Sequence, residues 1–396
     1  MTAAKPEPIP THDALVARAK ALAPTLRERA DAANAARQIP AATIADLREA
    51  GFFRILQPKR WGGFEAHPNT FFAVQMEIAA ACPSTAWVLG VVAVHNWQLA
   101  LFPAAAQEDV WGKDSSVLVS SSYMPVGKVT RVEGGFEFSG TWGFSSGSDH
   151  CDWAFLGGFV PVDDGPPDMR TFLVPRSDYE IVDDWNVIGL KATGSKTIRI
   201  ERAFVPEHRT HRFGDGFKQQ SPGHAENDAA LYRLPFGQIF VRSVSTAAIG
   251  MVQGALDAFV AVQAKRTARG DGRQVAADTR TQEAVALAVE TIDSARLVLA
   301  RNFDVMMGYC ERDERMPLDI RVLYRQHSAA VVDKCAAAID ALFVASGGSA
   351  IFLTNPIHRF FCDVHASRAH YANNPDKPGR NLGATVLGAK NTDYFL

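Results

Sequence analysis

The sequence predicts an α+β protein that is mainly helical, with one β region between two helical regions. Up to about residue 115, and again from about residue 237 onward, apolar side chains recur at spacings of three and four or cover a segment all round. Such patterns are typical of amphipathic and buried helices. Residues 117–210 instead form short alternating runs broken by Gly, Pro and Asp, which is typical of strands. The order of elements is therefore helices, sheet, helices.

Length and composition set the limits of this interpretation. The 396 residues are too many for one core, and we place three regions at 1–116, 117–212 and 213–396. A content of 47% hydrophobic and 21% charged residues is that of a folded protein. The formal net charge of −2, with no run of Lys and Arg, predicts neither a nucleic-acid nor a membrane partner. The five cysteines form no CxxC pair, and reduced thiols in the cytoplasm are expected.

The first region contains two segments that should be buried helices. "NTFFAVQMEIAAAC" and "STAWVLGVVAVHNWQLALF" are apolar nearly all round, and "ATIADLREAGF" before them ends in a glycine, as helices often do. The second segment places His95 in an otherwise apolar helix. By itself such a histidine is more often a satisfied core or surface residue than a functional one.

The β region opens with a hairpin pattern, "KVTRVEGGFEFSGTWGF", around a Gly-Gly turn. It contains two polar clusters. "TWGFSSGSDH" (141–150) is either a strand that ends in a polar turn or a wall that stacks on a flat ligand and hydrogen-bonds its edge. "SSSYMPVG" gives three adjacent hydroxyls at the end of the first strand, where a turn is the plainer interpretation.

The last region begins with a polar, mobile stretch around 211–228 and continues as four long helices that can form a bundle. Between two of these helices, "ASGGSAIF" is either a plain turn or a cradle for a phosphate. Gly348 and Ser349 would form that cradle, and Arg266 and Arg269 would supply counter-charges.

The segment "HRFFCDVHASRAH" holds three histidines. His358 and His365 are seven residues apart on one helical face, so a metal site is one alternative, but His370 falls off that face and no HExxH is present. A single histidine that acts as a base is the simpler hypothesis, because its ordinary pKa lies near working pH. No GxGxxG or GxxxxGK[ST] occurs, so a Rossmann or P-loop nucleotide site is not expected.

Further motifs resemble a known family. "GLKATGSKT" (189–197) is similar to the "GLRGTGS" segment of the acyl-CoA dehydrogenase superfamily, and "AFVPEHR" follows in the expected place. "LQPKRWGGFEAHP", "TWGFSSGSDH" and "FCDVHASRAHYANNPD" resemble the oxygenase components of two-component flavin-dependent monooxygenases of that superfamily. The resemblance covers most of the chain. It implies an N-terminal helical domain, a small β-barrel-like domain and a C-terminal four-helix bundle.

The resemblance also implies an activity. Reduced flavin, FMN or FAD, would arrive by diffusion from an NAD(P)H-dependent reductase and react with O₂ to form a C4a-hydroperoxyflavin. That species would hydroxylate a small phenolic substrate ortho to its hydroxyl group. The same resemblance implies a homotetramer in which Arg266 reaches the flavin of a neighbouring chain.

Residue roles follow from the resemblance position by position. Ser146 matches the serine near flavin N5, and His365 stands where we expect the catalytic base. The remaining expected contacts are Ser121 and Ser122 with the ring edge, Trp87 and Trp142 packed near the ring, and His95 with Ser121 and His365 around the phenol.

Two departures from the superfamily pattern bear on the reaction. No Glu occurs after residue 314, so the carboxylate base of an acyl-CoA dehydrogenase is missing. Cys362 stands where the family usually has arginine. The alternatives are a monooxygenase of the same fold that acts on an indole, amine or sulfur compound, an acyl-CoA dehydrogenase, and an inactive binding protein.

Overall fold

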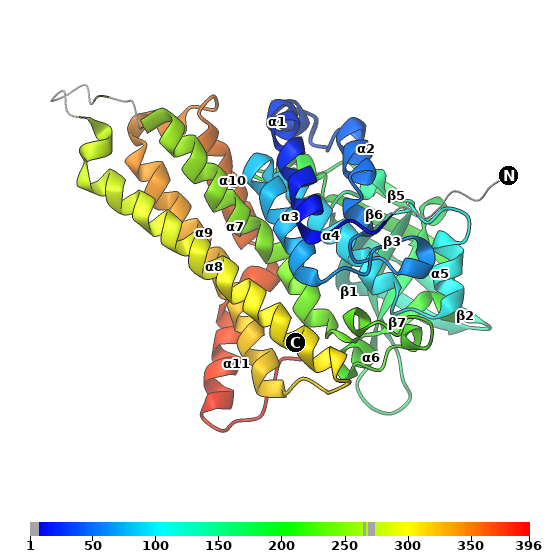
Figure 1. The fold of residues 1–396 in the computed structure, drawn as a ribbon. Coiled ribbons are helices and arrows are strands. Elements are labelled where there is room, and N and C mark those ends of the chain that lie inside the picture. Colours follow the sequence, from blue (N-terminus) through cyan, green and yellow to red (C-terminus); the bar gives the residue numbers. More distant parts are fainter. Residues whose placement is uncertain (1–7, 264–266, 268–273) are drawn as a thin grey trace.

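The chain forms an N-terminal set of helices, a seven-stranded sheet and a C-terminal helical bundle (Figure 1). The computed structural model describes residues 8–263, 267 and 274–396. The N-terminal helices α3 (Pro68–Ala81) and α4 (Pro83–Leu99) lie between the sheet and the bundle, since α4 packs against strand β1 as well as helix α7. The predicted mainly helical α+β class is confirmed.

The N-terminal helices follow the apolar pattern of the sequence. All residues of α4 are buried, as expected for a helix that is apolar all round. The Thr11 side chain caps the first helix by accepting the Ala14 amide at 3.2 Å. The other helices of this part are α1 (His12–Ala36), α2 (Ala41–Glu49) and α5 (Ala104–Trp111).

The seven strands have the order β5-β6-β2-β1-β3-β4-β7, with β1 and β3 parallel and all other neighbouring pairs antiparallel. One apolar core joins side chains of β2, β3, β4 and β6, so the sheet curls around its own interior. The strands are β1 (Val119–Val132), β2 (Gly135–Ser145), β3 (Trp153–Val160), β4 (Asp168–Pro175), β5 (Glu180–Val182), β6 (Lys196–Pro206) and β7 (Thr210–Arg212).

In the described residues, the C-terminal part is a bundle of three long helices of 28 to 33 residues, with a fourth helix of 13 residues packed against two of them. Its helices are α6 (Phe213–Lys218), α7 (Phe236–Gln263), α8 (Thr279–Glu311), α9 (Leu318–Ala345), α10 (Pro356–Arg368) and α11 (Asp376–Val386). In the part of the chain that the structure describes, only α7 has the length and hydropathy of a membrane span. Of its most apolar window, 72% is buried among the other helices, which is the environment of a core helix.

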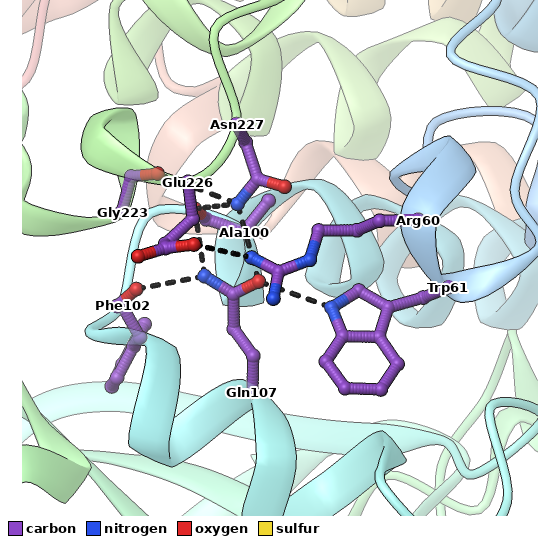
Figure 2. Close-up of polar contacts among 8 residues, drawn as sticks. All are labelled: Arg60, Trp61, Ala100, Phe102, Gln107, Gly223, Glu226 and Asn227. Carbon is purple, nitrogen blue, oxygen red and sulfur yellow. Dashed lines mark hydrogen bonds and ion pairs between the residues drawn. The ribbon is translucent and has the colours of Figure 1, made fainter.

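The polar stretch before α7 is folded onto the N-terminal helices rather than extended into solvent (Figure 2). Asn227 donates to the carbonyl of Ala100 at 2.9 Å and to Gln107 at 3.1 Å. Arg60 forms an ion pair with Glu226 at 3.1 Å. The expectation of a mobile loop missed this arrangement, because the polar side chains here bond the free carbonyls at the end of α4.

Candidate active site

Ser146 is placed by a bulge at the end of β2. The pairing of β2 with β6 shifts register between Trp142 and Ser145, and Phe144 between them has a left-handed backbone with φ of 64°. A bulge bends the strand and redirects the side chains that follow it. Gly147, with φ of 70°, then passes so close to Val88 that a Cβ would lie 2.9 Å from it. The bulge therefore directs Ser146 towards α4.

The Ser146 hydroxyl belongs to a chain of short hydrogen bonds. The indole nitrogen of Trp87, on α4, donates to Ser146 Oγ at 3.2 Å. Ser146 Oγ lies 2.7 Å from Ser195 Oγ, which lies 2.7 Å from Thr193 Oγ1. Thr193 in turn donates to the carbonyl of Leu190 at 2.8 Å. All four hydrogen-bonding side chains are buried.

The "GLKATGSKT" segment that carries Thr193 and Ser195 is fixed to α10. The amide of Leu190 donates to the Asp363 carboxylate at 2.5 Å, and burial raises the pKa of Asp363 to about 6. At Gly189 a Cβ would lie 2.1 Å from the carbonyl of Cys362, so only glycine fits there. The Cys362 thiol itself lies 3.7 Å from His358 Nε2, on the same helix.

His370 lies beside this chain, at the junction of α4 with the bundle. Its ring packs edge-on against Trp87 with centroids 5.6 Å apart. Burial, with a smaller effect of the Arg325 guanidinium, lowers the pKa of His370 to about 4. Nδ1 accepts the Ala372 amide at 3.1 Å as the cap of the short helix Tyr371–Asn373, so the neutral ring carries its proton on Nε2. His370 thus offers an N–H donor next to Trp87.

His365, the expected base, lies elsewhere on the bundle. Its Nε2 pairs with the Asp340 carboxylate of α9 at 2.8 Å, and its ring packs on Phe361 at 4.6 Å. Both members of the pair are partly exposed, with side-chain exposures of 27% and 43%. Among the described residues no hydrogen bond or ring contact joins His365 to Ser146 or Trp87. The structure therefore gives His365 a surface pair and places His370 at the junction.

His95 is buried between α4 and the sheet. Its Nδ1 lies 2.5 Å from the carbonyl of Val119 on β1, so Nδ1 carries the proton and Nε2 keeps a lone pair with no partner. Its ring meets the edges of Tyr123 and Phe155, with centroids 6.1 and 5.6 Å away. Burial lowers the pKa of His95 to about 4.

The hydroxyls of "SSSYMPVG" are divided between the two faces of β1. Successive side chains of a strand point to opposite faces. Ser120 and Ser122 share one face, where Ser120 Oγ donates to the carbonyl of Trp153 at 3.4 Å. Ser121 shares the other face with Tyr123, whose ring packs against His95 of α4. The two side chains of Ser121 and Ser122 therefore cannot both reach one ring edge, and only Ser121 faces the junction.

Trp142 belongs to the core of the sheet. Its side chain is fully buried against Phe138, and its indole nitrogen donates to the carbonyl of Gly157 at 2.9 Å. The expectation that it packs beside the flavin is not supported by this position. It precedes the bulge and faces inward like Phe136 and Phe138, whereas Ser146 follows the bulge.

The expected phosphate cradle lies at a bundle end. Gly348 and Ser349 form the short helix between α9 and α10, where the Ser349 hydroxyl donates to Ser346 and Asn355 donates to the Ser349 carbonyl. The neighbouring Ile351 is 67% exposed. Arg266 and Arg269 lie outside the described residues.

Neither of two surface hollows coincides with the junction. One of about 370 Å³ lies between α1, α3, α7 and α8, and one of about 500 Å³ lies beside β7 and α6. Their linings contain none of the expected site residues. The candidate site is therefore identified by the side chains that it brings together and not by the volume of a cavity. Within the described ranges no group of three or more His, Cys, Asp or Glu residues could hold a metal ion.

Sequence reasoning missed three contributors. Thr193 and Ser195 stand in the "GLKATGSKT" segment, whose resemblance indicates a family but no site, although hydroxyls on both sides of a glycine are a usable signal. From the sequence, His370 is only the third histidine of the metal-site alternative. Its position before "YANNP", as the cap of a new short helix, indicates that it leaves the face of α10.

The fold and this junction define the acyl-CoA dehydrogenase class. A family model described as the acyl-CoA dehydrogenase N-terminal domain matches residues 10–114, and one described as the C-terminal domain matches residues 243–375.

Curated relatives narrow the class. The chain is 42% identical over 380 residues to the flavin-dependent monooxygenase oxygenase subunit HsaA of Rhodococcus jostii, covering 96% of this chain and 100% of the relative. It is 33% identical to the oxygenase component of the FADH₂-dependent resorcinol hydroxylase of a Rhizobium species, covering 97% of each chain. The crystal structure of 3-HSA hydroxylase from Rhodococcus superposes with a TM-score of 0.94 at 41% identity, covering 98% of this chain and 100% of that one.

This chain belongs to the flavin-dependent monooxygenases, as an oxygenase component of the two-component type. The expected family, enzyme class and use of reduced flavin are confirmed, and the oxygenase subunit implies a separate reductase.

Proposed function

We propose that this protein hydroxylates a phenolic substrate with reduced flavin and O₂, at the junction of α4, β1, α7 and the segment that carries His370. The observation that supports it best is the set His370, Trp87 and Ser146, which joins a bundle histidine to a β-domain hydroxyl through one indole. When bound, reduced flavin supplies the electrons that activate O₂. The reductase that delivers it would use NAD(P)H.

The residues present fit a flavin ring. The ring of the flavin needs polar partners on its edge within an apolar surrounding. The buried residue Ser146 and the half-buried residue Ser121, on the α4 side, each provide a hydroxyl. Trp87 supplies an aromatic wall next to both Ser146 and His370. These three residues would hold the ring, and the surrounding apolar helices would exclude water from it.

We assign complementary roles to the two junction histidines. A phenol has an ordinary pKa near 10, so its proton must be removed before the ring can attack oxygen. His95 Nε2 has a free lone pair and would accept that proton, while its Nδ1–H stays bonded to Val119. His370 Nε2–H would donate to the phenolate oxygen and stabilise its charge. His365, in this proposal, has no catalytic role.

Assembly and compartment are further parts of the proposal. Apolar side chains that a partner could cover stand exposed on α7 and α8, namely Val260, Val262, Leu287, Val289 and Leu297. A homotetramer in the cytoplasm fits these surfaces and the five free cysteines. Light scattering should give four times the mass of the 43.0 kDa chain, and a monomeric mass with full activity would refute this part.

The experiment for the function is direct. Photoreduced FMN or FAD is mixed anaerobically with the purified protein, then with O₂ and a panel of phenols, indoles, amines and sulfur compounds. We expect a hydroxylated phenol as product. Oxygenation of the indoles or sulfur compounds alone would favour the alternative with the same fold.

A further inference from the structure

The chain of hydroxyls behind Ser146 has only one consistent direction. The Leu190 carbonyl can only accept, so the single hydroxyl proton of Thr193 is directed to it at 2.8 Å. Thr193 therefore cannot donate to Ser195, and Ser195 must donate to Thr193 across their 2.7 Å contact. The Leu190 carbonyl also accepts from the indole of Trp185 and from the Thr193 amide, each at 3.2 Å, and the hydroxyl contact at 2.8 Å is the shortest of the three.

The same reasoning fixes the donor and acceptor roles of Ser146. Because the proton of Ser195 is used towards Thr193, Ser146 must donate to Ser195 across the second 2.7 Å contact. Trp87 can only donate, and it occupies one lone pair of Ser146. Ser146 is then left with one lone pair and no free proton. Its hydroxyl can accept a further hydrogen bond but cannot donate one.

We infer that Ser195 and Thr193 are positioning residues that make Ser146 an acceptor, so that the site selects reduced flavin over oxidised flavin. The inference rests on the proposed placement of the flavin beside Ser146. Reduced flavin carries a hydrogen on N5, which an acceptor can bind. Oxidised flavin has only a lone pair on N5, and that lone pair would face the remaining lone pair of Ser146. An unfavourable pairing of two acceptors costs a buried site as much as a lost hydrogen bond.

The selection matters for a protein that takes its flavin from solution. Oxidised flavin is always present as a competitor, and the two forms have nearly the same size and shape. A difference in hydrogen-bonding character at N5 is a feature that protein atoms can recognise. The direction of the chain is set by backbone carbonyl and indole groups, neither of which can reverse its role.

The test measures the ratio of two dissociation constants, that of oxidised flavin divided by that of reduced flavin. Oxidised FMN and FAD are titrated by fluorescence quenching, and photoreduced flavin is titrated anaerobically. Ser195→Ala frees the Ser146 proton to donate to oxidised flavin. Thr193→Val removes the acceptor of Ser195 and so permits the chain to reverse. We expect the ratio to fall about threefold to tenfold in each, the effect of one hydrogen bond.

Two variants serve as controls. Thr193→Ser keeps the hydroxyl and should restore the ratio of the unmodified protein. Ser145→Ala removes the neighbouring buried hydroxyl, which has no hydrogen-bond partner, and should leave the ratio unchanged. Thermal unfolding of each variant shows whether it is folded.

The outcomes separate the inference from the proposed function. A merely structural chain would weaken the binding of both flavin forms in parallel, and an unchanged ratio in Ser195→Ala and Thr193→Val would overturn the inference. Equal binding of the two forms by the unmodified protein would overturn it too. Failure of the unmodified protein to bind either form would instead reject the proposed function.

Discussion

His365 and His370 are only five residues apart, yet they lie in opposite environments. His365 pairs with Asp340 on the partly exposed seam of α9 and α10. His370 begins a new short helix that turns it towards Trp87, and burial lowers its pKa to about 4. The pair of His365 and Asp340 is partly exposed to solvent and, within the described residues, has no hydrogen bond or ring contact with Ser146 or Trp87. His370, in contrast, presents one defined N–H beside Trp87. The chemistry of a histidine here depends on what surrounds it rather than on the segment that carries it.

The largest effect should separate the two histidines directly. His370→Ala should lower the rate of phenol hydroxylation about 10²–10³-fold, the usual cost of removing one preorganised donor. His365→Ala should change the rate less than about threefold. Single-turnover assays with reduced flavin, O₂ and substrate measure both. His370→Gln keeps an N–H donor and should recover part of the loss, whereas a variant as slow as His370→Ala would indicate that the residue acts as a base.

The second effect concerns the stability of the junction in acid. The pKa of His95 is about 4 in the folded protein and near 6.5 in an unfolded chain. Between these values the unfolded state takes up a proton that the folded state does not, so stability falls as the pH falls from 6.5 to 4, by about 3 kcal/mol for this group.

Urea unfolding at pH 7 and pH 5 should therefore show a smaller loss in His95→Asn than in the unmodified protein. His211→Asn is a matched variant outside the junction, since burial also lowers the pKa of His211 to about 4. If the unmodified protein and both variants lose the same unfolding free energy between pH 7 and pH 5, groups other than these histidines control the acid sensitivity.

A smaller effect should follow at the hydroxyl chain. Ser146→Ala should raise the H₂O₂ formed per hydroxylation about tenfold, because one buried hydrogen bond to the flavin is lost. Peroxide and product are measured in the same reaction. Ser145→Ala, its buried neighbour without a partner, is the control and should stay coupled. Equal uncoupling in both variants would point to general loosening of the bulge.

The smallest effect is expected at the surface pair. Asp340→Asn should change the free energy of unfolding by less than about 1 kcal/mol, since exposed ion pairs contribute little. Asp363→Ala on the facing helix is the contrast. It leaves the buried Leu190 amide without its acceptor and should cost about 1–3 kcal/mol. Thermal or urea unfolding of both variants checks the order.

The sequence by itself determined the fold class, the order of helices and strands, and the buried state of α4. These features follow from local periodicity and from apolar composition, which each segment carries by itself. The motifs also determined the family, because together they span most of the chain in the expected order. The role of Ser146 stays a prediction from the resemblance.

Only the tertiary structure decided which side chains meet at the junction. The bulge at Phe144 turns Ser146 away from the side of the strand that carries Trp142. The pleat of β1 places Ser121 and Ser122 on opposite faces. His370 caps a new short helix and so leaves the helix that carries His365. In each case the direction of a side chain changes within a few residues of the chain. Such changes depend on packing between segments that are distant in sequence, as when Asp363 of α10 holds the amide of Leu190 and with it the hydroxyl chain behind Ser146.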